Sequence, residues 1–320
     1  MQPASSTPRN VFLTGAATAL GREVTRLLAA RGHRVIGLTD SSAGAALVRQ
    51  DGGIPAFSDP LRAGEIQSVL RGAQTEVVLH LSPQVFNGFP SRHSGWETGG
   101  HSLILGTRAL LAAAEMAGVA SMVYAGCAFL YGDQGGEWIT EDASLAEQPL
   151  FSAALAAEDA VRQSPLPTCI LRAGFVYGPA EPQMQALGEA LRRGRSVYVG
   201  REDAFHNWVH LADLAQAVVL AAEQTTADAI FNVTDDQPAP AAALVDHLAA
   251  NLGLPPAARM ADRPLLSPVS DFQRALLSAS ARVQNVRVKS ALGWAPRYPT
   301  YQTGLENTLL VWRAEQPVAM

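Results

Sequence analysis

Short apolar, β-branched runs alternate with longer Ala- and Leu-rich stretches through the first two-thirds of the chain. This alternation limits the possible folds more than any other feature. Each apolar run predicts a parallel strand, and each longer stretch predicts the helix that crosses to the next strand. Runs such as EVVLHL at residues 76–81 are apolar almost throughout, which is typical of strands covered on both faces. The sequence therefore predicts an α/β fold with a Rossmann-type, doubly wound parallel sheet.

The pattern also predicts where one part of the fold gives way to another. After residue 178 the alternation loosens, and after residue 238 Pro and Ala become frequent. We expect residues 1–175 and 206–234 to form the Rossmann domain, with a smaller interleaved lobe from 176–205 and 235–320. Strands are predicted at 10–14, 34–38, 54–57, 76–81, 121–125, 168–172, 196–199 and 230–233. Helices are predicted at 19–31, 102–117, 151–163, 183–193, 211–223 and 301–313.

Composition excludes several classes of function. A net charge of −5 gives no basic face for nucleic acid. No apolar run reaches the roughly 20 residues that span a bilayer, and the polar N-terminus does not resemble a signal peptide. Two cysteines make neither a disulfide framework nor a metal site. We therefore expect a cytoplasmic protein with a small-molecule substrate and with no metal, membrane or nucleic-acid partner.

The stretch VFLTGAATALGREV runs from the first predicted strand into the first predicted helix. Glycines in such a turn allow the backbone to approach a pyrophosphate at the N-terminal end of the helix. Gly15 and Gly21 hold the outer positions of this motif, but Thr18 holds the middle one. Gly15, Thr18, Leu20 and Gly21 are the predicted contacts of this loop.

Several further motifs follow in order: VVLHLSPQ, MVYAGCAFLYG, ITEDASL, ILRAGFVYGP, WVHLADLAQAV and VQNVRVKSALGWAPRY. Together with TGAATALG they make nearly the whole chain resemble the extended short-chain dehydrogenase/reductases of the NAD-dependent epimerase/dehydratase type. The resemblance implies that the cofactor is NAD or NADP. It also implies a homodimer, formed through the helix pair 102–117 and 151–163.

The resemblance implies further cofactor contacts beyond the glycine loop. Asp40 either accepts hydrogen bonds from the adenosine ribose, which favours NAD over NADP, or caps the following helix. Asp59 either contacts the adenine or caps the helix that follows Pro60. Leu81 and Ser82 are expected to pass beneath the cofactor as backbone. Thr18 adds a β-branched side chain beside the pyrophosphate, so weakened cofactor binding is expected.

The family's proton relay, a Tyr-x-x-x-Lys pair assisted by Ser or Thr, is absent from this sequence. The resemblance places Leu150 at the tyrosine, Ala154 at the lysine and Cys127 at the Ser/Thr position. A shift in the alignment cannot restore the pair, because the only lysine, Lys289, lies in the C-terminal element. Losing a positioned acid or base lowers the rate by about 10²–10⁴.

Three residues are weak candidates for replacing that relay. Cys127 is either a thiol acid or nucleophile beside the cofactor, or a small buried apolar group. Tyr131 matches a tyrosine that the family keeps for structural reasons. His101, with His93, is expected in the loop before the long helix, where substrate contacts occur, whereas His80 is expected in the core.

The substrate side departs from the family as well. Phe175 replaces an Asn, and His206 an Arg, that bind the diphosphate in sugar-nucleotide members. We therefore expect an NAD(P)-binding protein that acts on a small metabolite other than a nucleotide sugar by a non-standard mechanism. Two alternatives stay open: a catalytically silent regulatory or structural subunit, and a cofactor-independent isomerase or lyase.

Overall fold

A seven-stranded sheet with the order β10-β7-β5-β4-β1-β2-β3 forms the centre of the computed structural model, which describes residues 7–81, 96–224, 226, 228–260 and 269–315. Every pair of neighbouring strands in it is parallel. The predicted doubly wound, Rossmann-type fold is thus confirmed. The strands are β1 (Asn10–Thr14), β2 (Arg34–Thr39), β3 (Ile54–Phe57), β4 (Val77–Leu81), β5 (Ser121–Cys127), β7 (Thr168–Ala173) and β10 (Ala229–Val233).

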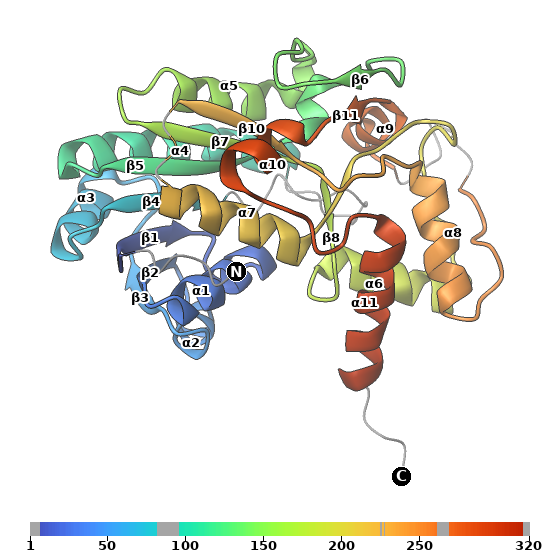
Figure 1. Ribbon diagram of the computed structural model, residues 1–320, viewed down its shortest axis with the longest axis horizontal. Helices are drawn as coiled ribbons and strands as arrows, with labels where there is room; N and C mark the ends of the chain where they lie inside the picture. Colours follow the sequence, from blue (N-terminus) through green and yellow to red (C-terminus); the bar gives the residue numbers. More distant parts are fainter. Residues whose placement is uncertain (1–6, 82–95, 225, 227, 261–268, 316–320) are drawn as a thin grey trace.

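Helices cover both faces of this sheet (Figure 1). On one face α1 and α7 pack against each other and enclose a core that includes Leu28, Leu79 and Leu214. On the other face α3, α4 and α5 enclose a second core that includes Ile66 and Val78. These helices, with α2 at the sheet edge, are α1 (Ala19–Ala30), α2 (Ser42–Gln50), α3 (Ala63–Gly72), α4 (Trp96–Ala117), α5 (Ser152–Arg162) and α7 (Leu211–Gln224).

The remaining elements gather beside the sheet, where α6, α8 and α11 lie together on the right of Figure 1. Two short parallel ribbons, β8–β9 and β6–β11, complete this part of the chain. The elements are η1 (Ala128–Tyr131), β6 (Trp138–Ile139), η2 (Pro149–Phe151), β8 (Phe175–Tyr177), α6 (Pro182–Arg192), β9 (Trp208–His210), α8 (Ala241–Asn251), α9 (Asp271–Ser278), β11 (Arg282–Val283), α10 (Val286–Leu292) and α11 (Tyr301–Glu315).

The predicted strand at 196–199 is wrong. Val197 makes a single bridge with Arg259, through backbone bonds to Ala258 and Met260. The pairing does not continue on either side, so the apolar residues of this run are buried without becoming a strand.

In the described part of the chain no helix is long and apolar enough to cross a membrane.

Asp213, in the first turn of α7, ties the C-terminal segment to the Rossmann sheet. Its Oδ1 accepts a hydrogen bond from the backbone N–H of Arg297 (2.7 Å), and its Oδ2 accepts one from Tyr298 (2.9 Å). The indole Nε1 of Trp294 donates to the backbone carbonyl of Asp213 (2.9 Å). The side chain is 1% exposed, so water cannot replace these bonds.

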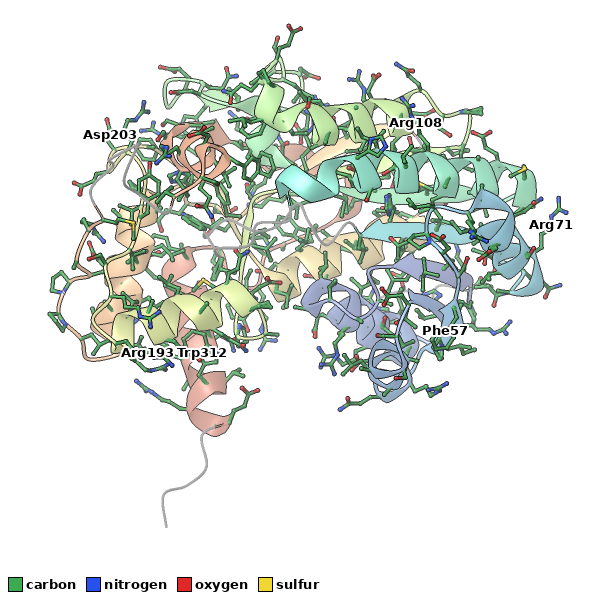
Figure 2. The ribbon with its side chains drawn as sticks, turned by 180° about the vertical axis from the view of Figure 1, so that it is seen from behind. Phe57, Arg71, Arg108, Arg193, Asp203 and Trp312 are labelled. Carbon is green, nitrogen blue, oxygen red and sulfur yellow. The ribbon has the colours of Figure 1, made fainter. Side chains whose placement is uncertain are left out.

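Replacing Asp213 with Asn is therefore expected to destabilise the protein by about 1–3 kcal/mol, because the amide N–H₂ turns a donor toward a buried backbone N–H. Urea unfolding followed by circular dichroism measures the change. Asp203→Asn is the matched control: Asp203 lies at the periphery in Figure 2, and its side chain is 82% exposed. The control is expected to change stability by less than about 0.5 kcal/mol. Equal effects of the two substitutions would contradict the proposed role of Asp213.

Candidate active site

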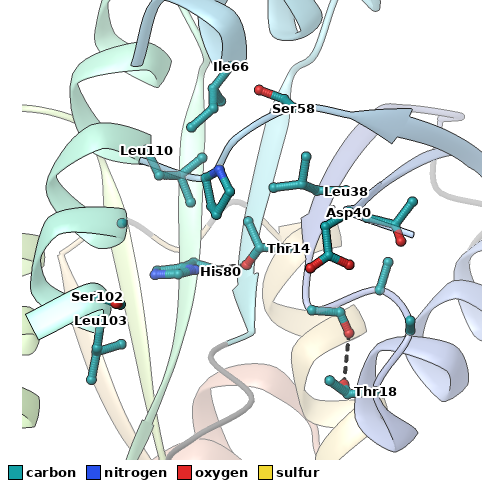
Figure 3. A pocket seen from close by; sticks show the side chains of 16 residues that line it. Thr14, Thr18, Leu38, Asp40, Ser58, Ile66, His80, Ser102, Leu103 and Leu110 are labelled. Atoms are coloured by element: carbon teal, nitrogen blue, oxygen red, sulfur yellow. Dashed lines mark hydrogen bonds between the residues drawn. The ribbon is translucent and has the colours of Figure 1, made fainter. Parts of the chain in front are cut away.

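A cavity of about 440 Å³ opens between β1 and β4, where the strand order reverses (Figure 3). Ligands of doubly wound folds bind at such switch points. Its lining comes from the ends of β1, β2 and β4, from the turns after β1 and β3, and from α3 and α4. The apolar part of the lining comprises Ala16, Ala17, Leu38, Pro60, Ile66, Leu103 and Leu110. The cavity thus combines a glycine loop with a largely apolar wall.

Gly15 and Gly21 leave no room for side chains. Gly15 has a φ of +68°, and a Cβ there would lie 2.3 Å from the carbonyl oxygen of Leu81. A Cβ on Gly21 would lie 2.1 Å from the carbonyl oxygen of Gly15. The loop therefore lies directly against the end of β4 and the start of α1. This close backbone packing fits a dinucleotide cradle.

Thr18, another predicted contact of this loop, is the N-cap of α1. Its hydroxyl donates to the carbonyl of Gly15 (2.8 Å; dashed in Figure 3) and accepts from the backbone N–H of Gly21 (3.1 Å). A side chain thus satisfies one of the N–H groups that the helix terminus would otherwise offer to a phosphate. Leu20 is 4% exposed and packs into the core, so only its backbone can face a ligand.

Asp40 lines the cavity and is exposed. Its carboxylate has no hydrogen-bond or ion-pair partner among the described residues. Ser41, and not Asp40, caps α2, because the Ser41 hydroxyl accepts the N–H of Gly44 (3.1 Å). The capping interpretation of Asp40 is therefore wrong, and its carboxylate is available to a ligand.

Asp59 does not line the cavity, although its neighbours Ser58 and Pro60 do. Its carboxylate accepts the N–H of Leu61 (2.9 Å) and pairs with Arg62 (3.3 Å), within the turn that precedes α3. Leu81 is buried at the end of β4 with its carbonyl against Gly15. Ser82 and His93 lie outside the described residues.

Tyr131 is 0% exposed, and its phenol is held on both sides. The hydroxyl donates to Oδ1 of Asn232 (2.8 Å) and accepts from Nη1 of Arg172 (2.7 Å). Burial raises the pKa of Tyr131, although the Arg172 charge opposes this. Arg172 also pairs with Glu158 at 2.6 Å, and both side chains are almost fully buried. The sequence did not reveal this network, which occupies Tyr131 and Glu158 in structural bonds.

Cys127 is 2% exposed in the core. Burial, and next the negative charge of Glu158, raise the pKa of its thiol well above the usual value. The group therefore stays a protonated thiol at neutral pH. Such an environment is the reverse of the electropositive, partly exposed one that activates a cysteine.

Leu150 and Ala154, at the sequence positions matched to the tyrosine and lysine, lie in apolar packing. Ala154, on α5, is 1% exposed and belongs to the core, and Leu150, in the η2 turn, is half-buried and packs against that core. The expectation that His101 lies in a loop is wrong, because α4 begins at Trp96 and includes it. His101 is exposed and does not line the cavity. The helix continues through the preceding glycines, and Gly100 packs closely on Ala153.

Aromatic side chains fill the region expected to receive the substrate. The ring of Phe175 lies 5.4 Å from that of His206 and 5.5 Å from that of Trp208, measured between centroids. A space of only about 20 Å³ is left beside Phe175 and His206. No described group of three or more His, Cys, Asp or Glu side chains is arranged to hold a metal ion.

Both ring nitrogens of His206 are used within the protein. Nδ1 accepts the N–H of Ala241 at the start of α8 (3.2 Å), so Nε2 carries the proton and donates to the carbonyl of Leu277 (3.2 Å). Burial lowers the pKa of His206 to about 4. A neutral imidazole cannot pair with phosphate as an arginine does.

Comparison with known proteins agrees with this architecture. The model of the NAD dependent epimerase/dehydratase family matches residues 11–234. The chain belongs to this family. A 3-diazoavenalumate denitrifying reductase of a Streptomyces species is 30% identical over 309 residues, which cover 92% of this chain and 98% of that protein.

Two more distant similar proteins carry the names of enzymes for sugar nucleotides. A UDP-glucose 4-epimerase of Mycolicibacterium smegmatis is 25% identical and covers 94% of this chain and 98% of that enzyme. A dTDP-glucose 4,6-dehydratase of Streptomyces venezuelae, solved with NAD bound, superposes with a TM-score of 0.78. At 21% identity, over 95% of this chain and 97% of the other, it shows the common fold.

Thr18→Gly is expected to strengthen NADH binding by about 5- to 10-fold, because it frees the Gly21 N–H for a charge-assisted bond to phosphate. Thr18→Ser keeps the capping hydroxyl and is expected to bind like the wild type. Isothermal calorimetry measures both. A glycine variant that binds no more tightly than the serine variant would show that the cap does not limit binding.

His206→Asn is expected to make stability less sensitive to acid. The folded pKa of about 4 lies below the ordinary 6.5, so the stability due to neutral His206 is complete above pH 6.5 and is lost as the pH falls toward 4. The wild type should lose about 2 kcal/mol from this group between pH 6.5 and 5, and the variant none. Urea unfolding at pH 7.5 and 5 gives the free energy of unfolding of each protein, and the difference between wild type and variant should decrease by that amount at pH 5. A difference that does not change with pH would contradict this role of His206.

Proposed function

We propose that this chain is a nicotinamide-dependent reductase of a small apolar or aromatic acceptor, and that no protein side chain supplies a proton. The observation that carries the proposal is the apolar packing of Ala154, which is buried, and of Leu150, which is half-buried, in a chain that keeps Gly15 and Gly21 in its first loop. The cofactor cradle is retained, whereas the acid–base positions are packed as core.

The cofactor proposed is NAD(H), with NADP(H) disfavoured. Gly15 and Gly21 allow the backbone to approach the pyrophosphate, and Asp40 presents an unpaired carboxylate in the same cavity. A carboxylate accepts hydrogen bonds from ribose hydroxyls and repels a 2′-phosphate. The Thr18 cap is proposed to weaken binding, because it already satisfies Gly21.

Reduction of a carbonyl places negative charge on oxygen, so it needs a proton donor close by. The described residues near the end of β5 do not offer one. Cys127 is buried, and Tyr131 and Glu158 are bonded to Arg172. An acceptor whose reduction requires no proton suits this environment better than a ketone or an alcohol–ketone pair.

A diazo-arene is such an acceptor, and the name of the Streptomyces relative refers to the reduction of a diazo compound with removal of nitrogen. Reduced nicotinamide would supply two electrons and one hydrogen as hydride; the C–N bond of an arenediazonium breaks, N₂ leaves, and a C–H bond forms. The equation balances without a proton from the protein. The chain's own residues then need only hold the two reactants and exclude water.

A nucleotide-sugar substrate is disfavoured on this proposal. Phe175 and neutral His206 pack against each other, and neither side chain can form an ion pair with a diphosphate. We further propose a homodimer through α4 and α5, whose outer surfaces flank a depression of about 370 Å³ lined by Arg108 and Asp159 among others. A cytoplasmic setting suits the two buried, free cysteines.

The test follows NADH oxidation at 340 nm with a para-substituted arenediazonium salt and, as the matched carbonyl, benzaldehyde. We expect oxidation above the enzyme-free rate, with release of N₂, for the diazonium alone, and a rate at least about 100-fold lower for the aldehyde. Cys127→Ala should keep the diazonium rate within about twofold, since no thiol proton is needed.

Efficient aldehyde reduction, or loss of activity in Cys127→Ala, would instead identify a proton donor. NADH binding without turnover of either compound would favour the catalytically silent alternative.

A further inference from the structure

Three side chains from three elements form a continuous chain of hydrogen bonds beneath the cavity. His80 of β4 lies between Thr107 of α4 and Thr14 of β1. Its Nε2 is 3.0 Å from Oγ1 of Thr107, and its Nδ1 is 2.8 Å from Oγ1 of Thr14. His80 and Thr14 line the cavity (Figure 3), whereas Thr107 is fully buried behind them.

The direction of each hydrogen bond in this chain is determined by its inner end. The hydroxyl of Thr107 has one proton, and it donates that proton to the carbonyl of Leu103 one turn earlier in α4 (2.8 Å). Thr107 can therefore only accept from His80, so the proton of the imidazole is on Nε2. In a neutral ring Nδ1 is then an acceptor, and Thr14 must donate to it.

His80 is neutral for a structural reason. It is 8% exposed, and its neighbours are the two threonines and the ring of Tyr124, whose centroid is 5.5 Å away. Burial lowers the pKa of His80 to about 4. His80 therefore keeps its single proton on Nε2 throughout the neutral pH range.

We propose that Thr107 and His80 are positioning residues that fix Thr14 Oγ1 as a hydrogen-bond acceptor at the floor of the cavity. The ligand must then present a hydroxyl or N–H group at this point, and a phosphate oxygen is excluded there. The inference rests on the proposed function in so far as the ligand is a nicotinamide dinucleotide.

The arrangement divides the cavity by polarity. Thr14 and the carboxylate of Asp40 are acceptors, whereas the loop from Gly15 to the start of α1 offers backbone N–H groups. A ligand that fits this division has an anionic centre between groups that carry donors. A dinucleotide has that pattern, with its ribose hydroxyls and carboxamide N–H₂ on either side of the pyrophosphate.

Thr107→Val tests the proposal without touching the ligand site, and Thr107→Ser is the control that keeps the hydroxyl. Valine leaves Nε2 without its acceptor, so the proton can move to Nδ1 and Thr14 can turn its own proton to the cavity. The ¹⁵N NMR shifts of His80 should show an Nε2-protonated neutral ring in the wild type and in Thr107→Ser, and an altered pattern in Thr107→Val. An Nδ1-protonated wild type would overturn the proposal.

Calorimetry then identifies which hydroxyl or N–H group of the ligand donates to Thr14, by using ligands that each lack one such group. Adenosine is compared with its 2′-deoxy and 3′-deoxy forms, and NAD⁺ with its 3-acetylpyridine analogue, which lacks the carboxamide N–H₂. Removing the group that donates to Thr14 should weaken binding by about 5- to 10-fold in the wild type and Thr107→Ser, and by less than twofold in Thr107→Val. Equal losses in all three proteins would overturn the proposal. If no nucleotide binds, the proposed function fails, and the NMR result alone decides the order of protons.

Discussion

The close approach of Gly15 to the carbonyl of Leu81 is the constraint on which the candidate site depends. It brings the turn after β1 against the end of β4, where the order of the sheet reverses. The same turn places Gly21 against Gly15, so α1 starts beside the cavity with its N–H groups turned to the loop. Because both contacts are between backbones, they tolerate great change in the side chains around them. The fold can keep its cradle while the chemistry beside it changes.

The apolar residues at positions 150 and 154 are consistent with each other in physical terms. A lysine at Ala154 would place an ammonium group at a site that is 1% exposed, where removal from water is costly without a partner. A tyrosine at Leu150 would lack that charge and keep an ordinary, high pKa. Replacing both with apolar residues lets α5 pack on the core without an unpaired polar group. Leu150 in η2 and Ala154 in α5 thus carry no polar group that would need a partner.

The sequence predicted what depends on local pattern and missed what depends on distant partners. The sheet strands and the position of Gly15 followed from alternation and motif, because burial on both faces leaves a clear apolar signature. The bonds of Tyr131 to Asn232, 101 residues away, left no such signature. Asp40 and Ser41 are adjacent and both suit a helix cap, so only coordinates separate them. His101 was misplaced because the predicted helix began at residue 102, whereas α4 begins at Trp96 and Gly100 packs closely on Ala153 of α5.

The protons of Cys127, Tyr131 and His80 are held in place by their surroundings. Cys127 keeps its proton because burial penalises the thiolate, and the phenol of Tyr131 is bonded to Arg172 and Asn232. His80 holds its single proton on the nitrogen that faces Thr107. Each of these three protons therefore has a fixed partner or an apolar surrounding that holds it in place. A site with immobile protons can still bind and orient two reactants, which is sufficient for a hydride acceptor that is already cationic and loses that charge on reduction.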